Sequence, residues 1–452
     1  MSSKCVHTFL LGLVLALPAL GQSSSPAQDP PTAAATPAAQ STNANAPAQD
    51  TSSTASAPAA QSAPANPPAQ QPAPAPAPAP APAGPPTWSA GPIDFSGLVD
   101  VYYTFNGNHP HNVAGSTGCN PSFPAGCGNQ LYNFNVIPNS FSLNMLKLSA
   151  SHSPDPVGFQ VDFGFGRAFD IISQNEKQPE IFRYIEQAYA SFKPARLHGV
   201  EIDFGKFVTS DGAEVIETPN NWNYSRSLLF SWAIPYYHFG LRVNFPVGKH
   251  FTGGFMLVNG WNNVEDNNSG KTVMFTGAYT AKYFGWAVNY HTGPENPNTN
   301  KGWRHLFDTT LTLTPTSKVS AYINYDYGQN RCVIPTGAET TTCATTSGFS
   351  LPLSVWTGVA GALHVQVTPK WAITPRIEWF ADRQGFSTGT PQHVKEGTFT
   401  VEYKMLEGLL ARAEYRYDWS DVPFFNRLDA LAVSKHQTTA TLGVVAFFGP
   451  KR

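Results

Sequence analysis

The chain has 452 residues, of which 13% are charged and 13% aromatic, and its formal net charge at pH 7 is -2. The charged share is about half that of typical soluble proteins, and the near-zero net charge gives no reason to expect a nucleic-acid partner. After the N-terminus no segment approaches the roughly twenty consecutive apolar residues of a membrane-spanning helix, so helical spans are excluded. The mean hydropathy of -0.23 does not exclude a membrane barrel, because lipid-facing and lumen-facing residues cancel in any window average.

The N-terminal region predicts an exported protein. Residues 1–21 combine Lys4, an apolar run from Phe9 to Leu17 and a small-residue site ending at Gly21, which is typical of a cleaved secretory signal peptide. Residues 22–87 consist largely of Ala, Pro, Ser, Gln and Thr and end in a proline repeat. Such a segment has too few large apolar residues to form a core, so we expect a disordered periplasmic tether.

From residue 88 to the C-terminus, alternating segments follow one another, and we count about sixteen, most of them close to the 9–11 residues of a tilted membrane strand. The first is "PIDFSGLVDVYYTF" and the last is "QTTATLGVVAFF". Residues 411–421, "ARAEYRYDWSD", show the pattern most clearly. Tyr415, Tyr417 and Trp419 occupy alternate positions and so share one face of a strand, whereas Arg412 and Arg416 share the other face; the two sets of alternate positions are called the two parities below. A period of two predicts strands whose two faces meet different environments.

The connections between these segments favour a membrane barrel over a soluble sandwich. Tight turns such as "TPTSK" and "LEG" alternate strictly with long loops such as 106–138, 210–235 and 330–352. Outer-membrane barrels have short periplasmic turns, long external loops and an even number of strands. Aromatic residues also gather near the strand ends, as in two interfacial girdles. We therefore predict that residues 88–452 form an all-β, transmembrane, antiparallel up-and-down barrel of about 16 strands, surrounded by outer-membrane lipid.

The sequence also resembles the OmpL-like β-barrel porin family of Gram-negative bacteria. The resemblance rests on "FSGLVDVYYTFN", "NSFSLNMLKLSASHSPDPVGFQVDFGFGRAFDII" and "NWNYSRSLLFSWAIPYYHFGLR" and covers roughly residues 93–448. It implies a passive outer-membrane diffusion channel for small hydrophilic solutes, with no cofactor and no enzymatic activity. Barrel chains commonly end on an aromatic residue, whereas here Phe448 is followed by "GPKR". The barrel-assembly machinery remains an expected partner. Porins of this size are often trimers, although no segment marks an interface.

The third long loop differs from the others because it contains the apolar stretch "LLFSW". In a fully solvated loop these large apolar side chains would be exposed to water at a cost in free energy. We therefore expect this loop to fold into the barrel and narrow the channel. Its acids, at near-helical spacing, would face arginines on the lumen parity of their strands, and opposed charges across a pore would select solutes by charge. The predicted constriction comprises Asp211, Glu214, Glu217, Arg242, Arg376, Arg412 and Arg416. The alternative is that these arginines merely pair with lumen acids such as Glu378, Glu402, Glu414 and Asp418.

Four cysteines remain after the signal peptide, and they form two local pairs, Cys119 with Cys127 and Cys332 with Cys343. In an exported chain this spacing favours small disulfide-closed loops over a zinc site. Neither pair has the spacing or the neighbouring histidines of tetrahedral zinc ligation.

Other functions receive weaker support. "GFSTG", residues 385–389, matches the nucleophile pattern of serine hydrolases, but that pattern requires a strand-to-helix turn on a parallel sheet. "HPH", residues 109–111, is more simply an inert loop segment than a metal site. The principal alternative to a channel is a barrel that serves as an adhesin or tethers the envelope. An outer-membrane lipid hydrolase would need a Ser/His pair on the lipid-facing parity, and we find none.

Overall fold

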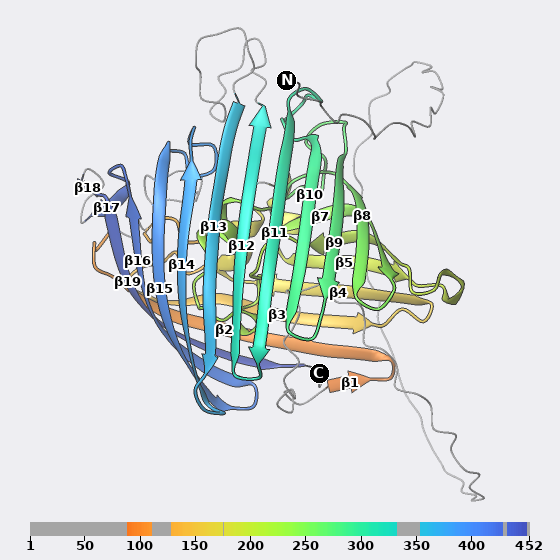
Figure 1. Cartoon of the computed structure of the whole chain (residues 1–452), viewed down its shortest axis with the longest axis horizontal. Coiled ribbons are helices and arrows are strands. Elements are labelled where there is room, and N and C mark those ends of the chain that lie inside the picture. Colours follow the sequence, from red (N-terminus) through yellow and green to blue (C-terminus); the bar gives the residue numbers. More distant parts are fainter. Residues whose placement is uncertain (1–87, 111–127, 175, 332–352, 428–431, 450–452) are drawn as a thin grey trace, which may run out of the picture. The chain divides into compact units, whose positions relative to one another are not determined.

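The computed structural model describes residues 88–110, 128–174, 176–331, 353–427 and 432–449. Within this part, sixteen long strands form a closed antiparallel barrel (Figure 1). Each strand pairs with its neighbours in sequence, and the last strand closes the barrel on the first, with Thr439 opposite Asn106 and Phe448 opposite Gly97. The predicted fold class and strand number are confirmed.

The sixteen strands are between 8 and 15 residues long. They are β2 (Ile93–Asn106), β3 (Phe141–His152), β4 (Val157–Phe165), β5 (Ile185–Phe192), β6 (Glu201–Val208), β7 (Tyr237–Val247), β8 (Phe251–Val258), β9 (Thr272–Thr280), β10 (Phe284–Pro294), β11 (Trp303–Thr316), β12 (Val319–Arg331), β13 (Leu353–Gln366), β14 (Trp371–Asp382), β15 (Gln392–Leu406), β16 (Leu409–Ser420) and β19 (His436–Phe448).

Short elements occupy the ends and the loops, and none of them follows from the period-two pattern. The strand β1 (Trp88–Ala90) pairs with the start of β2, and β17 (Phe425–Arg427) and β18 (Ala432–Ser434) form a hairpin in the last long loop. The helices are α1 (Arg167–Ile172), α2 (Pro179–Phe182), α3 (Leu228–Trp232) and the 3-10 turns η1 (Ala195–Leu197) and η2 (Thr218–Asn220). No helix in the described ranges is long and apolar enough to span a membrane.

The predicted alternation of connections is also confirmed. Only residues 317–318 separate β11 from β12, and only residues 407–408 separate β15 from β16, whereas residues 209–236 separate β6 from β7. The strands therefore define a turn end and a loop end of the barrel. The predicted signal peptide, the tether and all four cysteines of the predicted disulfide pairs lie outside the described residues.

Strand parity separates an apolar outer wall from a polar interior. In β16 the side chains of Arg412, Arg416 and Asp418 are buried, whereas Tyr415 and Tyr417 are exposed on the outer wall. Ile377 in β14 is 72% exposed and Leu442 in β19 is 54% exposed. A continuous apolar wall of this kind is typical of contact with lipid.

Exposed aromatic side chains gather near both ends of the outer wall. At the turn end these are Phe192, Phe251, Tyr279, Phe284 and Trp371, and at the loop end they are Phe105, Phe141, Trp303, Tyr327 and Tyr417. Aromatic side chains are enriched at the interface between hydrocarbon and headgroups, and Tyr and Trp favour it most because their rings also carry a polar group. The two bands match the girdles of an outer-membrane barrel.

Candidate functional site: the third long loop inside the barrel

The third long loop, residues 209–236, is called L3 below and lies in the barrel interior. The side chains of Leu228, Leu229 and Phe230 in its helix α3 are at most 3% exposed. They belong to one apolar cluster with Trp356 of β13 and Phe380 of β14. Burial of these large apolar groups favours the inward position of L3 by removing them from water. The expected inward fold of this loop agrees with the structure.

Glycines in the barrel wall allow L3 to approach closely. A Cβ atom at Gly443 of β19 would lie 2.1 Å from Cε2 of Tyr224, and one at Gly358 of β13 would lie 2.4 Å from Cδ2 of Leu229. Contacts this short do not occur between real carbon atoms, so a larger residue at either position would require the Tyr224 ring or the Leu229 side chain to move. The absence of a side chain at these two positions therefore determines how tightly L3 packs on the wall.

The three acids predicted for the constriction bind three different strands. Asp211 pairs with His291 of β10 at 2.9 Å, and Glu214 pairs with Arg376 of β14 at 2.7 Å. Glu217 forms a close ion pair with Lys147 of β3. Burial raises the pKa of Glu217, but the Lys147 ammonium outweighs this effect and holds the pKa below its ordinary value. L3 is thus joined to the wall at three separate points, of which the contacts of Glu214 and Glu217 are ion pairs.

The near-helical spacing of these acids does not correspond to a helix. Residues 211–217 are irregular, and the helical turns of L3 lie later, at Thr218–Asn220 and Leu228–Trp232. Ser227 begins α3, and its hydroxyl accepts a hydrogen bond from the Phe230 amide at 3.0 Å. The irregular path lets each acid point toward a different strand, which a helix with all three on one face would prevent.

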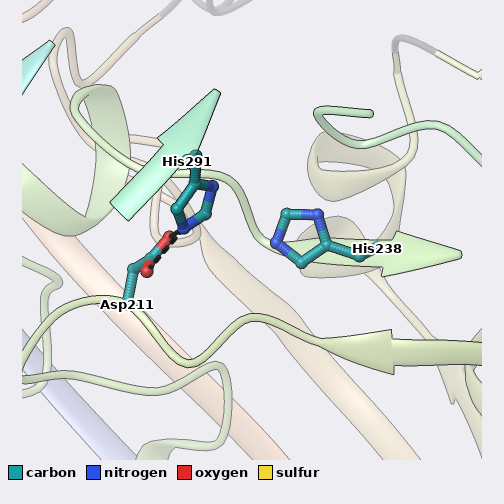
Figure 2. A group of neighbouring side chains, drawn as sticks. All are labelled: Asp211, His238 and His291. Atoms are coloured by element: carbon teal, nitrogen blue, oxygen red, sulfur yellow. Dashed lines mark hydrogen bonds and ion pairs between the residues drawn. The ribbon is translucent and has the colours of Figure 1, made fainter. Parts of the chain in front are cut away.

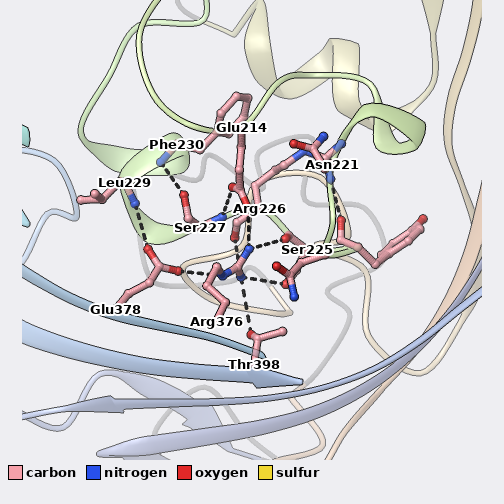
Figure 3. Close-up of polar contacts among 12 residues, drawn as sticks. Glu214, Asn221, Ser225, Arg226, Ser227, Leu229, Phe230, Arg376, Glu378 and Thr398 are labelled. Carbon is pink, nitrogen blue, oxygen red and sulfur yellow. Dashed lines mark hydrogen bonds and ion pairs between the residues drawn. The ribbon is translucent and has the colours of Figure 1, made fainter. Parts of the chain in front are cut away.

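The arginines of the wall hold the backbone of L3 rather than line open water. Arg376 donates to the carbonyl oxygen of Ser225 at 2.8 Å (Figure 3). Arg412 donates to the carbonyl oxygen of Thr218 at 2.7 Å, and Arg416 to that of Arg226 at 2.7 Å. All three guanidinium-bearing side chains are at most 1% exposed. Arg412 and Arg416 therefore face the interior, as predicted, but L3 covers them, and they contact its backbone rather than its acids.

Acids of the wall complete the contact by accepting from L3 amides. Glu378 accepts from the amide of Leu228 at 2.8 Å, which satisfies an unpaired donor at the start of α3. Glu414 accepts from the amides of Tyr224 at 2.6 Å and Ser225 at 2.9 Å. Charged groups of both signs thus replace the water that would otherwise bind the loop backbone.

The alternative prediction, that the arginines pair with neighbouring acids on the lumen side of the wall, also holds for several of them. Arg416 binds Asp418 at 2.7 Å and Arg412 binds Glu402 at 2.7 Å. Arg242 pairs with Asp203 at 2.8 Å, and the two are register partners on β6 and β7. Among the seven predicted constriction residues, Glu214 and Arg376 are the one pair that the described structure joins directly in an ion pair.

Sequence reasoning missed several groups that hold L3. Arg226, inside the loop, donates to the carbonyl oxygens of Val215 at 2.9 Å and Ile216 at 2.6 Å and so closes L3 on itself. Asp100 of β2 accepts from the hydroxyls of Thr218 at 2.5 Å and Tyr224 at 2.7 Å. For Lys147 and Asp100, the position on the lumen-facing side of a strand could have indicated a contact with L3. For Arg226, a single arginine within an irregular loop, the sequence has no comparable pattern.

The first long loop covers part of L3. Trp232 of α3 donates from Nε1 to the carbonyl oxygen of Leu131 at 3.1 Å. The guanidinium carbon of Arg416 lies 4.3 Å from the ring centre of Tyr132, which is 1% exposed. Residues of two long loops therefore lie in the interior at this level.

The hydrolase-like motif does not form a catalytic site. "GFSTG" lies in the loop between the antiparallel strands β14 and β15. There the Asp382 carboxylate accepts from the amides of Phe386 at 2.8 Å, Ser387 at 2.9 Å and Thr388 at 2.7 Å. The strand-to-helix turn that a nucleophile serine requires is not found at this position.

A sixteen-stranded barrel with an apolar outer wall and an inward third loop defines an outer-membrane protein of the porin class. The model of the family described as "Putative beta-barrel porin-2, OmpL-like" matches residues 92–448. The chain belongs to this family and is a channel for passive diffusion.

Solved structures agree with this fold. OmpT of Vibrio cholerae superimposes with a TM-score of 0.50 at 11% identity, over 80% of this chain and 100% of that one. OmpF of Salmonella typhi, in complex with daunomycin, gives a TM-score of 0.50 at 14% identity, over 79% of this chain and 97% of that one. No curated protein sequence matches the chain significantly.

Proposed function

We propose that this porin passes small hydrophilic solutes and that L3 sets the width and the charge selectivity of its channel. The observation that carries the proposal is the burial of L3 within the barrel, where Glu214 meets Arg376 and Arg412 and Arg416 bind its backbone. A barrel of about sixteen strands has an interior wide enough for an aqueous channel. A loop that fills part of this space reduces the bore.

The polarity of the interior supports hydrophilic rather than apolar solutes. Buried Thr104, Thr441 and Asn106 on β2 and β19 join the charged side chains of the wall. The hydroxyls of Thr104 and Thr441 lie 2.9 Å apart, across the strand pair that closes the barrel. Groups of this kind exchange hydrogen bonds with water and with polar solutes at little cost.

The experiment that tests the proposal is planar-bilayer recording of the purified mature protein. Stepwise ohmic currents, reduced by neutral sugars below a defined size, are expected. Insertion without current would contradict the proposal and would favour the alternative, an adhesin or envelope-tethering barrel. The result does not depend on the identity of the natural solute.

The proposal extends to the arrangement of the protein in the envelope. Strand β2 begins at the turn end of the barrel, so residues 22–87 would enter the periplasm if that end faces inward. Protease added to intact cells should then leave this segment uncut, whereas protease added to permeabilised cells should cleave it. We also propose a homotrimer, which native mass spectrometry of the detergent-solubilised protein would test by a mass three times that of one chain.

A further inference from the structure

Two histidines and one aspartate converge in the barrel interior, away from the arginines that hold L3. His238 lies on β7, His291 on β10 and Asp211 at the start of L3 (Figure 2). All three are buried, and one potential ligand atom from each lies within 4.8 Å of the others. Nε2 of His291 is 2.9 Å from both carboxylate oxygens of Asp211. The proposed channel uses none of this chemistry.

Hydrogen bonds prepare the His238 imidazole to act as a ligand. Its Nδ1 lies 3.1 Å from the carbonyl oxygen of Gly260, which can only accept, so Nδ1 carries the proton. Nε2 therefore has a free lone pair, which faces the Thr209 hydroxyl at 3.2 Å. A backbone carbonyl that fixes the tautomer in this way is the usual outer-shell partner of a metal-binding histidine.

A small cavity borders both imidazoles. Its lining includes His238, His291, Thr272 and Glu295. The Glu295 carboxylate is held by the Thr272 hydroxyl at 2.5 Å and by the Trp261 amide at 2.9 Å. Arg304 also lines the cavity and interacts electrostatically with Glu295. The oxygen atoms of Glu295 and Thr272 can hold a water molecule that completes the coordination of an ion bound by the imidazoles.

Two further buried acids lie near Asp211. Asp308 and Asp326 face each other on β11 and β12, and both are 0% exposed. Both interact electrostatically with Asp211. The Asp308 carboxylate accepts hydrogen bonds from the side-chain amides of Asn289 and Asn324, each at 2.8 Å. A cation bound at Asp211 would be attracted by these acidic side chains as well.

We propose that Asp211, His238 and His291 bind one divalent transition-metal ion of the Zn²⁺ type, with water as a further ligand. Bonds of about 2.0–2.2 Å place the ligand atoms of a tetrahedral site about 3.3 Å apart. His238 must move toward the other two side chains to reach this geometry, whereas Nε2 of His291 and the Asp211 carboxylate, now 2.9 Å apart, must separate slightly. The Thr209 hydroxyl, now 3.0 Å from Asp211 and 3.2 Å from His238, moves aside. The two imidazoles favour such an ion over Ca²⁺ or Mg²⁺, which prefer oxygen ligands alone.

Cobalt absorption tests this site directly. The untagged mature protein in detergent is stripped of metal with a chelator, titrated with Co²⁺ and followed by visible absorption. One Co²⁺ per chain with the intense bands of a low-coordinate complex is expected, together with loss of these bands when Zn²⁺ is added. A spectrum that stays that of aqueous Co²⁺ would overturn the proposal from the wild-type protein alone.

Variants then identify the ligands. D211N, H238Q and H291Q should each weaken Co²⁺ binding by at least the roughly 10–100-fold that loss of an outer-shell partner causes. The control is H393Q, which disrupts a His–Asp pair with Asp421 at 2.8 Å on the exposed side of the loop end. Heat-dependent migration on gels checks that each variant is folded. Folded ligand variants that bind like the wild type, or an equal loss in H393Q, would contradict the assignment.

Discussion

Nη1 of Arg376 lies 2.7 Å from Oε1 of Glu214, and this contact joins strand β14 to L3 across 162 positions of sequence. The Arg376 side chain is fully buried and that of Glu214 is 4% exposed. Arg376 also pairs with two acids of the wall, Glu378 at 3.2 Å and Glu396 at 3.4 Å, so Glu214 is the one carboxylate of L3 among its partners. The contact is therefore a sensitive test of whether L3 controls the channel.

Neutralisation of Glu214 should loosen L3. In E214Q the loop loses a charge-assisted bond while Arg376 keeps Glu378 and Glu396, so we expect its attachment to weaken by about 2 kcal/mol. Single-channel recording should show a larger conductance or stronger open-channel noise. E407Q is the matched control, because it removes the same charge from a partly exposed pair with Lys404 at 3.2 Å on the turn end. Equal recordings from E214Q, E407Q and the wild type would contradict the proposed role of L3.

The glycine beneath Tyr224 offers a steric test that changes no charge. In G443A the new methyl group would overlap the Tyr224 ring, whose Cε2 lies 2.1 Å from the added Cβ position. Overpacking of this kind costs about 1–3 kcal/mol. Displacement of L3 should alter the conductance. The double variant G443A/Y224A removes the overlap and should return the conductance toward that of Y224A alone.

The control for this steric test is G397A, because a Cβ atom at Gly397 has no neighbour within 4 Å. It should record like the wild type. A G443A channel identical to G397A would show that the position of Tyr224 does not affect the bore.

Removal of two wall arginines tests charge selectivity. R412A/R416A deletes two positive charges that contact the L3 backbone through Asn223 and Arg226. The reversal potential in a salt gradient should shift toward cation preference, and the conductance should rise as the loop loosens. R196A/K249A is the control, because both residues are exposed at the turn end and the change in charge is the same. Unchanged ion selectivity in R412A/R416A would refute the predicted role of these arginines.

The barrel could be predicted from sequence because its signal is local. In β16 the alternation of Tyr415 and Tyr417 with Arg416 reports the environment of each face without knowledge of any partner strand. The inward fold of L3 could also be predicted, because a fully solvated loop would leave the large apolar side chains of "LLFSW" in water.

The contacts of L3 could not be predicted in the same way, because they depend on the path of an irregular chain. Glu217 meets Lys147, and Asp211 meets His291 rather than an arginine. Arg242 faces the interior as predicted, but its ion-pair partner is Asp203, which lies directly opposite on the neighbouring strand β6. Parity states which side a residue faces, whereas register and loop path decide its partner.

The outer wall provides a test of membrane depth. Ile377 lies near the middle of β14 and is 72% exposed, and Leu406 at the turn end of β15 is 65% exposed. A lysine on the lipid face costs about 2–4 kcal/mol at the bilayer centre and about 0–1 kcal/mol near the interface. I377K should therefore reduce the folded fraction in urea titrations with lipid vesicles, and L406K should not. Equal folded fractions for the two variants would mean that this wall does not cross the hydrocarbon core at Ile377.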